Sequence, residues 1–255
     1  MKEQLHTIPI HDAMTHAGEC PFCYIERKTE EHAMDFVLGH GASYMEADIR
    51  EMTDKEGFCR NHFKKMFDYG NALGNAWILK TMYMRYLEEA DKEFKNFKPQ
   101  ASSKKSLFSK DKNPQDSNSI VNWIKHREES CFICKMVDQT FHAYMKTFFE
   151  LYKKDATFKD QIKATQGFCL NHFKILLSYA DEVLKDQAKQ EFYDIVLPLE
   201  RENLERIFED VSWFVEKFDY KNKDADWKNS KDAVQRGMQK LKGSDPSLPA
   251  YVMKK

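Results

Sequence analysis

The chain contains Gly57-Phe58-Cys59-Arg60-Asn61-His62-Phe63-Lys64 and, further on, Gly167-Phe168-Cys169-Leu170-Asn171-His172-Phe173-Lys174. Eight of the thirteen positions from Gly57 to Tyr69 are identical to their counterparts 110 residues later. Each stretch has a Cys-x-x-Cys pair upstream, which reads C-P-F-C at Cys20 to Cys23 and C-F-I-C at Cys131 to Cys134. The two pairs and the two stretches together account for all 6 cysteines. The sequence is therefore a tandem duplication of one Cys-x-x-Cys … Cys-x-x-His set.

This set predicts a metal site in each repeat. Thiolate and imidazole ligands suit Zn²⁺, which binds four of them as a tetrahedron in structural sites. A Cys-x-x-His at the start of a helix presents both side chains on one face. The simplest closure is within each repeat, with about 35 residues forming a helical hairpin between the ligand pairs. The predicted ligands are Cys20, Cys23, Cys59 and His62 for the first site, and Cys131, Cys134, Cys169 and His172 for the second.

We expect two zinc ions per chain. An iron–sulfur cluster is disfavoured because such clusters usually take four cysteines. The next hypothesis is redox chemistry, in which Cys20/Cys23 and Cys131/Cys134 form switchable disulfides. A nucleophilic dyad of Cys59 and His62 is weaker still, since catalysis would not explain the Cys-x-x-Cys pairs. Four protein ligands leave no open position on the metal, which is typical of a structural site and disfavours an enzyme.

The composition favours an all-α fold. Among 255 residues there are only 9 glycines and 7 prolines, and the remainder is rich in helix-forming residues. We expect two tandem related helical bundles, each pinned by a Cys3His site. The expected segments are a first repeat with its N-terminal extension at 1–97, a flexible linker at 98–119, a second repeat at 120–220, and a tail with a short amphipathic helix at 221–255.

Three local features carry further predictions. Pro9 predicts an extended segment over residues 5–10. Pro198 predicts a kink or break in a long helical run over 170–219. In the tail, Ser230 looks like the N-cap of a helix that would dock on the protein's own body. The apolar side of that helix would comprise Ala233, Val234, Met238 and Leu241.

Charge and hydropathy argue against two classes of partner. The formal net charge is −1, which gives no reason to expect nucleic acid. No apolar stretch is long enough for a membrane-spanning helix, and the first residues lack the apolar core of a secretory signal. We therefore expect a cytoplasmic protein with an unknown protein or small-molecule partner.

The chain resembles a bacterial family of uncharacterised proteins, domain of unknown function 6062. The resemblance rests on Thr7 to Ile10, on C-P-F-C, on Ser43 to Asp48 and on G-F-C-x-x-H. It implies no activity that could be carried over. The leading hypothesis is a binding or adaptor module with two structural zinc sites. The alternatives are a redox- or metal-responsive regulator and an enzyme with a pocket between the repeats.

Overall fold

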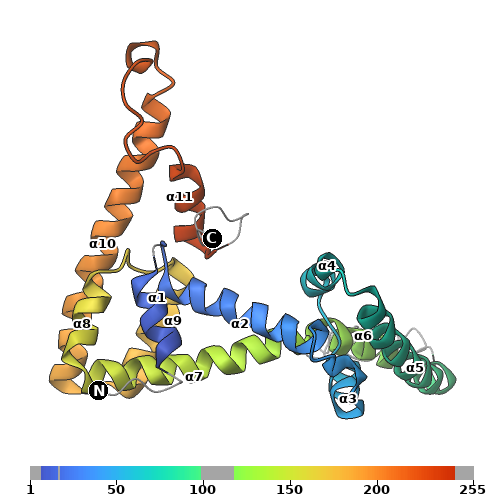
Figure 1. The fold of residues 1–255 in the computed structure, drawn as a ribbon. Coiled ribbons are helices and arrows are strands. Elements are labelled where there is room, and N and C mark those ends of the chain that lie inside the picture. Colours follow the sequence, from blue (N-terminus) through green and yellow to red (C-terminus); the bar gives the residue numbers. More distant parts are fainter. Residues whose placement is uncertain (1–6, 17, 99–117, 245–255) are drawn as a thin grey trace, which may run out of the picture. The chain divides into compact units, whose positions relative to one another are not determined.

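The computed structural model describes residues 7–16, 18–98 and 118–244, and these residues form helices and no strand (Figure 1). The predicted all-α class is confirmed. The elements are α1 (Ile8–Thr15), α2 (Pro21–Leu38), η1 (Ser43–Met45), α3 (Ala47–Glu56), α4 (Arg60–Tyr69), α5 (Ala72–Asn96), α6 (Ser119–Glu129), α7 (Phe132–Lys154), α8 (Ala156–Lys163), α9 (Leu170–Val183), α10 (Asp186–Glu216), η3 (Tyr220–Asn222) and α11 (Ala233–Lys242).

The chain divides into two compact units that do not coincide with the sequence repeats. Unit 1 comprises Met1–Thr29 and Thr140–Lys255, and unit 2 comprises Glu30–Gln139. The boundaries fall inside α2 and α7, the helices that follow the two Cys-x-x-Cys pairs. Each unit therefore combines the later helices of one repeat with the start of the other repeat, up to the first turns of α2 or α7. The predicted linker at 98–119 falls within unit 2, and its residues 99–117 lie outside the described part of the chain.

The core of unit 1 is rich in aromatic rings. Phe22, from the start of α2, stacks on Phe168 with ring centroids 5.4 Å apart and also contacts Phe141 and Phe148 of α7. Three cysteines, Cys20, Cys23 and Cys169, belong to this buried cluster. Aromatic pairs of this kind contribute roughly 0.5–1.5 kcal/mol beyond the area they bury.

The core of unit 2 joins the end of α2 to the start of α7. Val37 and Leu38 pack with Ile78 of α5, and Phe132 and Ile133 of α7 belong to the same cluster. Helix α6 is joined to α5 by hydrogen bonds to one carboxylate. Arg127 Nε of α6 donates to Glu89 Oε2 of α5 over 2.9 Å, and Trp123 Nε1 donates to the same oxygen over 2.9 Å.

The prediction from Pro9 is wrong for the described residues, and α10 has no break at Pro198. Pro9 lies in the first turn of α1, where a helix has no use for its missing N–H, so a helix begins at Ile8; residues 5 and 6 of the predicted extended segment lie outside the described part of the chain. Pro198 lies inside α10, which continues without a break from Asp186 to Glu216. Neighbouring helices pack against α10 on both sides of Pro198, and this packing outweighs the lost hydrogen bond.

Helix α11 packs against α10 and α9 (Figure 1). The side of α11 that faces them is polar. Arg236, Gln239 and Lys240 are buried. The expected apolar side is exposed instead at Val234, Met238 and Leu241. Buried acids explain the reversal, because Arg236 pairs with Asp210 of α10 at 2.9 Å and with Glu19 at 3.6 Å.

We predict that Glu89→Gln destabilises unit 2 by about 2–3 kcal/mol at neutral pH, because Arg127 would stay buried without a counter-charge. Burial opposes ionisation of Glu89, but hydrogen bonds from Arg127, Trp123 and Arg85 outweigh it and lower the pKa of the carboxyl from 4.5 to about 2. The folded-state pKa lies below the unfolded one, so this stabilisation is complete above pH 4.5 and disappears as the pH falls toward 2.

Urea unfolding at neutral pH and near pH 2 measures this difference. Wild type and Glu89→Gln should differ clearly at neutral pH and converge in acid. Glu88→Gln, at an exposed position of the same helix, is the matched control and should behave as wild type at both. If Glu89→Gln lowered the free energy of unfolding equally at both pH values, the stabilisation would not come from the ionised Glu89 carboxylate.

Candidate metal centres

The eight predicted ligands form two groups, and each group draws on both repeats. Cys20 and Cys23 of the first repeat meet Cys169 and His172 of the second, in unit 1. The second group, in unit 2, comprises Cys59, His62, Cys131 and Cys134. Both groups could hold a metal ion, since their ligand atoms lie within 4.8 Å of one another. The predicted closure within each repeat is therefore wrong, although each Cys-x-x-Cys does join a Cys-x-x-His.

Helix lengths explain the exchange. A helix rises about 1.5 Å per residue, so α2 is about 27 Å long and α3, which follows it, about 15 Å. In the second repeat α7 is about 35 Å long and α8 about 12 Å. In each repeat the helix that precedes the Cys-x-x-His is much shorter than the helix that follows the Cys-x-x-Cys, and it cannot span the length of that helix. The ligands pair across the repeats instead.

Helix starts position all the ligands. Cys59 and Cys169 are the N-caps of α4 and α9, and His62 and His172 lie in the first turns of these helices. Cys20 and Cys131 immediately precede α2 and α7. The positive ends of four helix dipoles therefore surround the thiolates, two at each group, and favour their negative charge.

Two glycines allow the chain to turn just before the Cys-x-x-His ligands. Gly57 and Gly167 have φ of +66° and +71°, a region that other residues rarely adopt. Space is restricted as well, because a Cβ at Gly167 would lie 2.7 Å from Glu200 Oε2. In unit 2 the Gly57 carbonyl accepts a hydrogen bond from the Phe132 amide at 2.9 Å, which joins the two ligand-bearing motifs.

The distances between ligand atoms fit a four-coordinate metal. Sulfurs about 2.3 Å and a nitrogen about 2.0 Å from a tetrahedral Zn²⁺ would be separated by about 3.8 Å (S to S) and about 3.5 Å (S to N). The sulfurs of Cys23 and Cys169 are 3.6 Å apart, and those of Cys59 and Cys134 are 3.9 Å apart. In unit 1 the distances from Nδ1 of His172 to the cysteine sulfurs are 3.5 Å for Cys20, 3.4 Å for Cys23 and 3.2 Å for Cys169. In unit 2 the distances from Nδ1 of His62 to the cysteine sulfurs are 3.2 Å for Cys59, 3.2 Å for Cys131 and 3.4 Å for Cys134.

A carboxylate lies near the outer nitrogen of each histidine. Nε2 of His62 lies within hydrogen-bond distance of Glu30, at 2.9 Å, and Glu30 also accepts a hydrogen bond from Lys65; Nε2 of His172 lies 3.6 Å from Glu26. The Glu30 carboxylate fixes the His62 ring and leaves Nδ1 directed at the sulfurs, as in histidine-ligated zinc proteins.

The surroundings of His62 favour positive charge on its imidazole. Burial lowers the pKa of this imidazole, but hydrogen bonds with the Cys131 sulfur and Glu30 outweigh burial and raise it to about 10. A metal ion on Nδ1 would supply the same positive charge while the outer nitrogen keeps its bond to Glu30.

The group in unit 1 is enclosed by packing and by the end of α11. The rings of Phe141 and His172 stack with centroids 5.1 Å apart. A Cβ added at Gly243, which follows α11, would lie 3.7 Å from Cys23 Sγ. The buried ammonium of Lys240 donates to the Gln166 carbonyl at 2.7 Å, just before the Gly-Phe-Cys turn. Positive charge and packing thus surround three clustered sulfurs.

The two groups differ in exposure. All four ligand residues in unit 1 are buried. In unit 2, Cys134 is exposed and Cys59 is partly exposed, whereas His62 and Cys131 are buried. A duplicated ligand set has therefore produced one enclosed group and one that solvent reaches at the Cys134 sulfur.

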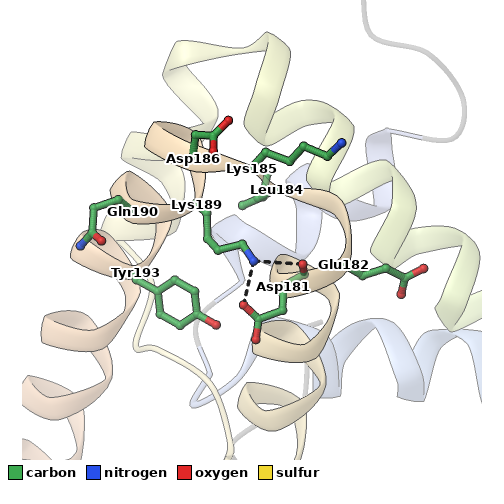
Figure 2. A pocket seen from close by; sticks show the side chains of 8 residues that line it. All are labelled: Asp181, Glu182, Leu184, Lys185, Asp186, Lys189, Gln190 and Tyr193. Atoms are coloured by element: carbon green, nitrogen blue, oxygen red, sulfur yellow. Dashed lines mark hydrogen bonds and ion pairs between the residues drawn. The ribbon is translucent and has the colours of Figure 1, made fainter.

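A separate pocket lies at the turn between α9 and α10, within unit 1 (Figure 2). Lys189 donates to the backbone carbonyl and the carboxylate of Asp181, at 3.0 and 3.1 Å. The lining residues are Asp181, Glu182, Leu184, Lys185, Asp186, Lys189, Gln190 and Tyr193. This set contains no cysteine, histidine or serine. The pocket is formed by two successive helices of one repeat and is not the pocket between repeats that the enzyme hypothesis requires.

Sequence reasoning identified all eight residues of the two groups but not the residues around them. Glu26 and Glu30 lie one helical turn apart on α2, yet they serve different histidines. The equivalent positions of the second repeat are Val137 and Phe141, so the duplication offers no hint of this role. These carboxylates could be identified only from the structure, because it shows that α2 contributes residues to both units.

None of the described helices combines the length and apolar character needed to cross a bilayer. No curated protein and no solved structure matches the chain. A family of unknown function, DUF6062, matches residues 1–247, which include both repeats and α11. The chain belongs to the DUF6062 family.

Proposed function

We propose that this chain is a zinc-binding helical module in which two structural Cys3His sites fasten the two repeats to each other. The observation that carries the proposal is the spacing of the ligand atoms, which matches the edges of a zinc tetrahedron in both groups. Zinc is favoured over iron–sulfur chemistry by the histidine in each group. The thiolate-rich sites suit a reducing compartment such as the cytoplasm.

Closed coordination argues for a structural role of the metal. Three cysteines and a histidine fill all four positions of Zn²⁺, so no position is left for water or substrate. With three thiolates, each site carries a net charge of −1, which the helix N-termini offset. Because each site takes two ligands from each repeat, it stabilises the arrangement of the repeats. Metal binding would therefore give the protein a rigid surface. Because such a surface suits the binding of a partner, we assign the protein the role of a binding or adaptor module.

Pairs of cysteine substitutions test the ligand sets. The untagged wild type should contain about two zinc ions per chain. Cys23→Ser combined with Cys169→Ser removes two ligands from one site, so we expect about one zinc to remain. Cys23→Ser combined with Cys59→Ser damages both sites and should leave almost none. Closure within each repeat predicts the opposite pattern for these two variants. Elemental analysis of the purified proteins decides between them.

Removal of the metal should destabilise the protein strongly. Structural zinc contributes on the order of 10 kcal/mol in small modules, and the sulfurs of Cys20, Cys23 and Cys169 would repel one another in the core without it. We expect a strong chelator to lower the melting temperature measured by calorimetry, and added zinc to restore it. The variant Cys23→Ser with Cys169→Ser should melt earlier than wild type before any chelator is added, and chelator should lower its melting temperature further by removing the zinc of unit 2. A chelated wild type that contains no zinc but melts normally would contradict the structural role.

A second candidate function is supported by the exposed sulfur of Cys134 in unit 2. Here the site acts as a redox-responsive element. One hydrogen peroxide oxidises the thiolates of Cys131 and Cys134 to a disulfide, takes up two protons and yields two waters, and zinc leaves because two ligands are lost. The enclosed site of unit 1 would remain intact under the same conditions.

We predict biphasic zinc release by peroxide, with the first zinc leaving at least about tenfold faster than the second, because thiolate oxidation follows exposure. A chromogenic zinc indicator follows both phases. Cys59→Ser with Cys134→Ser retains only the site of unit 1 and should show the slow phase alone. Release of both ions at one rate would exclude the regulatory candidate while leaving the structural proposal in place.

A further inference from the structure

Helix α5 of unit 2 has apolar residues on two opposite faces. The inner face packs against α3 and η1 and includes Gly74, Ile78 and Met82, which are buried. The outer face is largely exposed and is apolar at five large side chains, of which Phe94 also contacts Trp123 of α6 with ring centroids 6.3 Å apart. Their exposed fractions are 63% for Leu73, 63% for Tyr83, 56% for Met84, 67% for Leu87 and 59% for Phe94.

The outer face has the spacing of a coiled-coil seam. Four of the five large side chains belong to a series that recurs at alternating intervals of three and four along almost the whole helix, while Met84 flanks it. The series is Leu73, Ala76, Lys80, Tyr83, Leu87, Ala90 and Phe94. This repeat forms a stripe about 32 Å long down one side of a helix. A single exposed apolar residue is ordinary, but a continuous seam of this length is typical of a surface that another helix covers.

We propose that the outer face of α5 is a homodimer interface, on which α5 of a second copy of this chain lies antiparallel. In an antiparallel pair the two kinds of seam position face each other. Ala76 then faces Phe94 of the second copy, and Tyr83 faces Leu87 of the second copy. Each bulky residue meets a smaller one, and the same contacts repeat on the other side of the two-fold axis.

Charge along the seam selects the same arrangement. Lys80 is the one cation of the seam. In the antiparallel register it faces Ala90 of the second copy, which is followed in that copy by Asp91. The small alanine leaves room for the ammonium to reach the Asp91 carboxylate. In the single chain Lys80 lies over the Trp77 ring at 5.0 Å, and Asp91 pairs with exposed Lys95 at 3.4 Å. A parallel pair would instead bring two Lys80 ammoniums together.

The exposed area is sufficient for a specific but modest dimer. A fully buried Phe or Tyr removes roughly 150–250 Å² from water, so five large side chains that are about 60% exposed offer on the order of 500 Å² per chain. Stable interfaces bury roughly 800 Å² per partner, and the flanking polar residues of α5 would add to the apolar seam. We therefore expect a reversible dimer at micromolar concentration.

Sedimentation velocity of the full-length, zinc-loaded chain from low to high micromolar concentration tests the proposal. Wild type should shift from monomer to dimer. Leu87→Lys places a charge at the centre of the seam and should raise the dimer dissociation constant at least about a hundredfold. Phe208→Lys on α10, at an equally exposed aromatic residue, is the matched control and should dimerise as wild type. Helix content and zinc content of both variants verify folding.

Charge exchange tests the register. Lys80→Glu and Asp91→Lys should each raise the dissociation constant about tenfold, because like charges then meet across the axis. The double variant with both changes should regain most of the wild-type affinity. A monomeric wild type, or dimerisation that Leu87→Lys leaves unchanged, overturns the interface. Two weakening single changes that do not compensate overturn the antiparallel register.

Discussion

The lengths of α2 and α7 constrain how the duplicated ligand motifs can meet. Each of these helices begins at a Cys-x-x-Cys and continues well past the reach of the shorter helix that follows it. The thiols at its start therefore lie beside the Cys-x-x-His of the other repeat. A duplication that could have produced two independent metal-bound bundles has produced two units, each of which requires both repeats.

This exchange explains why the units have different boundaries from the repeats. Helix α2 contributes Cys20 and Cys23 to unit 1 and its remaining turns to the core of unit 2. The two sites have since acquired different surroundings. Around the first, Gly243 and buried Lys240 bring the end of α11 against the ligands, whereas around the second the Cys134 sulfur faces solvent. The enclosed site is suited to a permanent structural role, and the open one is suited to exchange or oxidation.

Much of the molecule could be predicted from the sequence because its signals are local. The ligand residues, the helices that follow them and the glycine turns are all encoded within a few residues. The ligand pairing could not be predicted, since it depends on the relative lengths of α2 and α3. The orientation of α11 also depends on distant residues, because Asp210 and Glu19 draw Arg236 inward.

NMR of the chain loaded with an NMR-active cadmium isotope reveals which cysteines and histidine bind each metal ion, and so whether each ion is shared between the repeats. Scalar coupling correlates each cadmium with the cysteine and histidine protons of its own ligands. The structure predicts one cadmium correlated with Cys20, Cys23, Cys169 and His172, and another with the remaining four ligands. A cadmium correlated with both Cys20 and Cys59 would contradict the account.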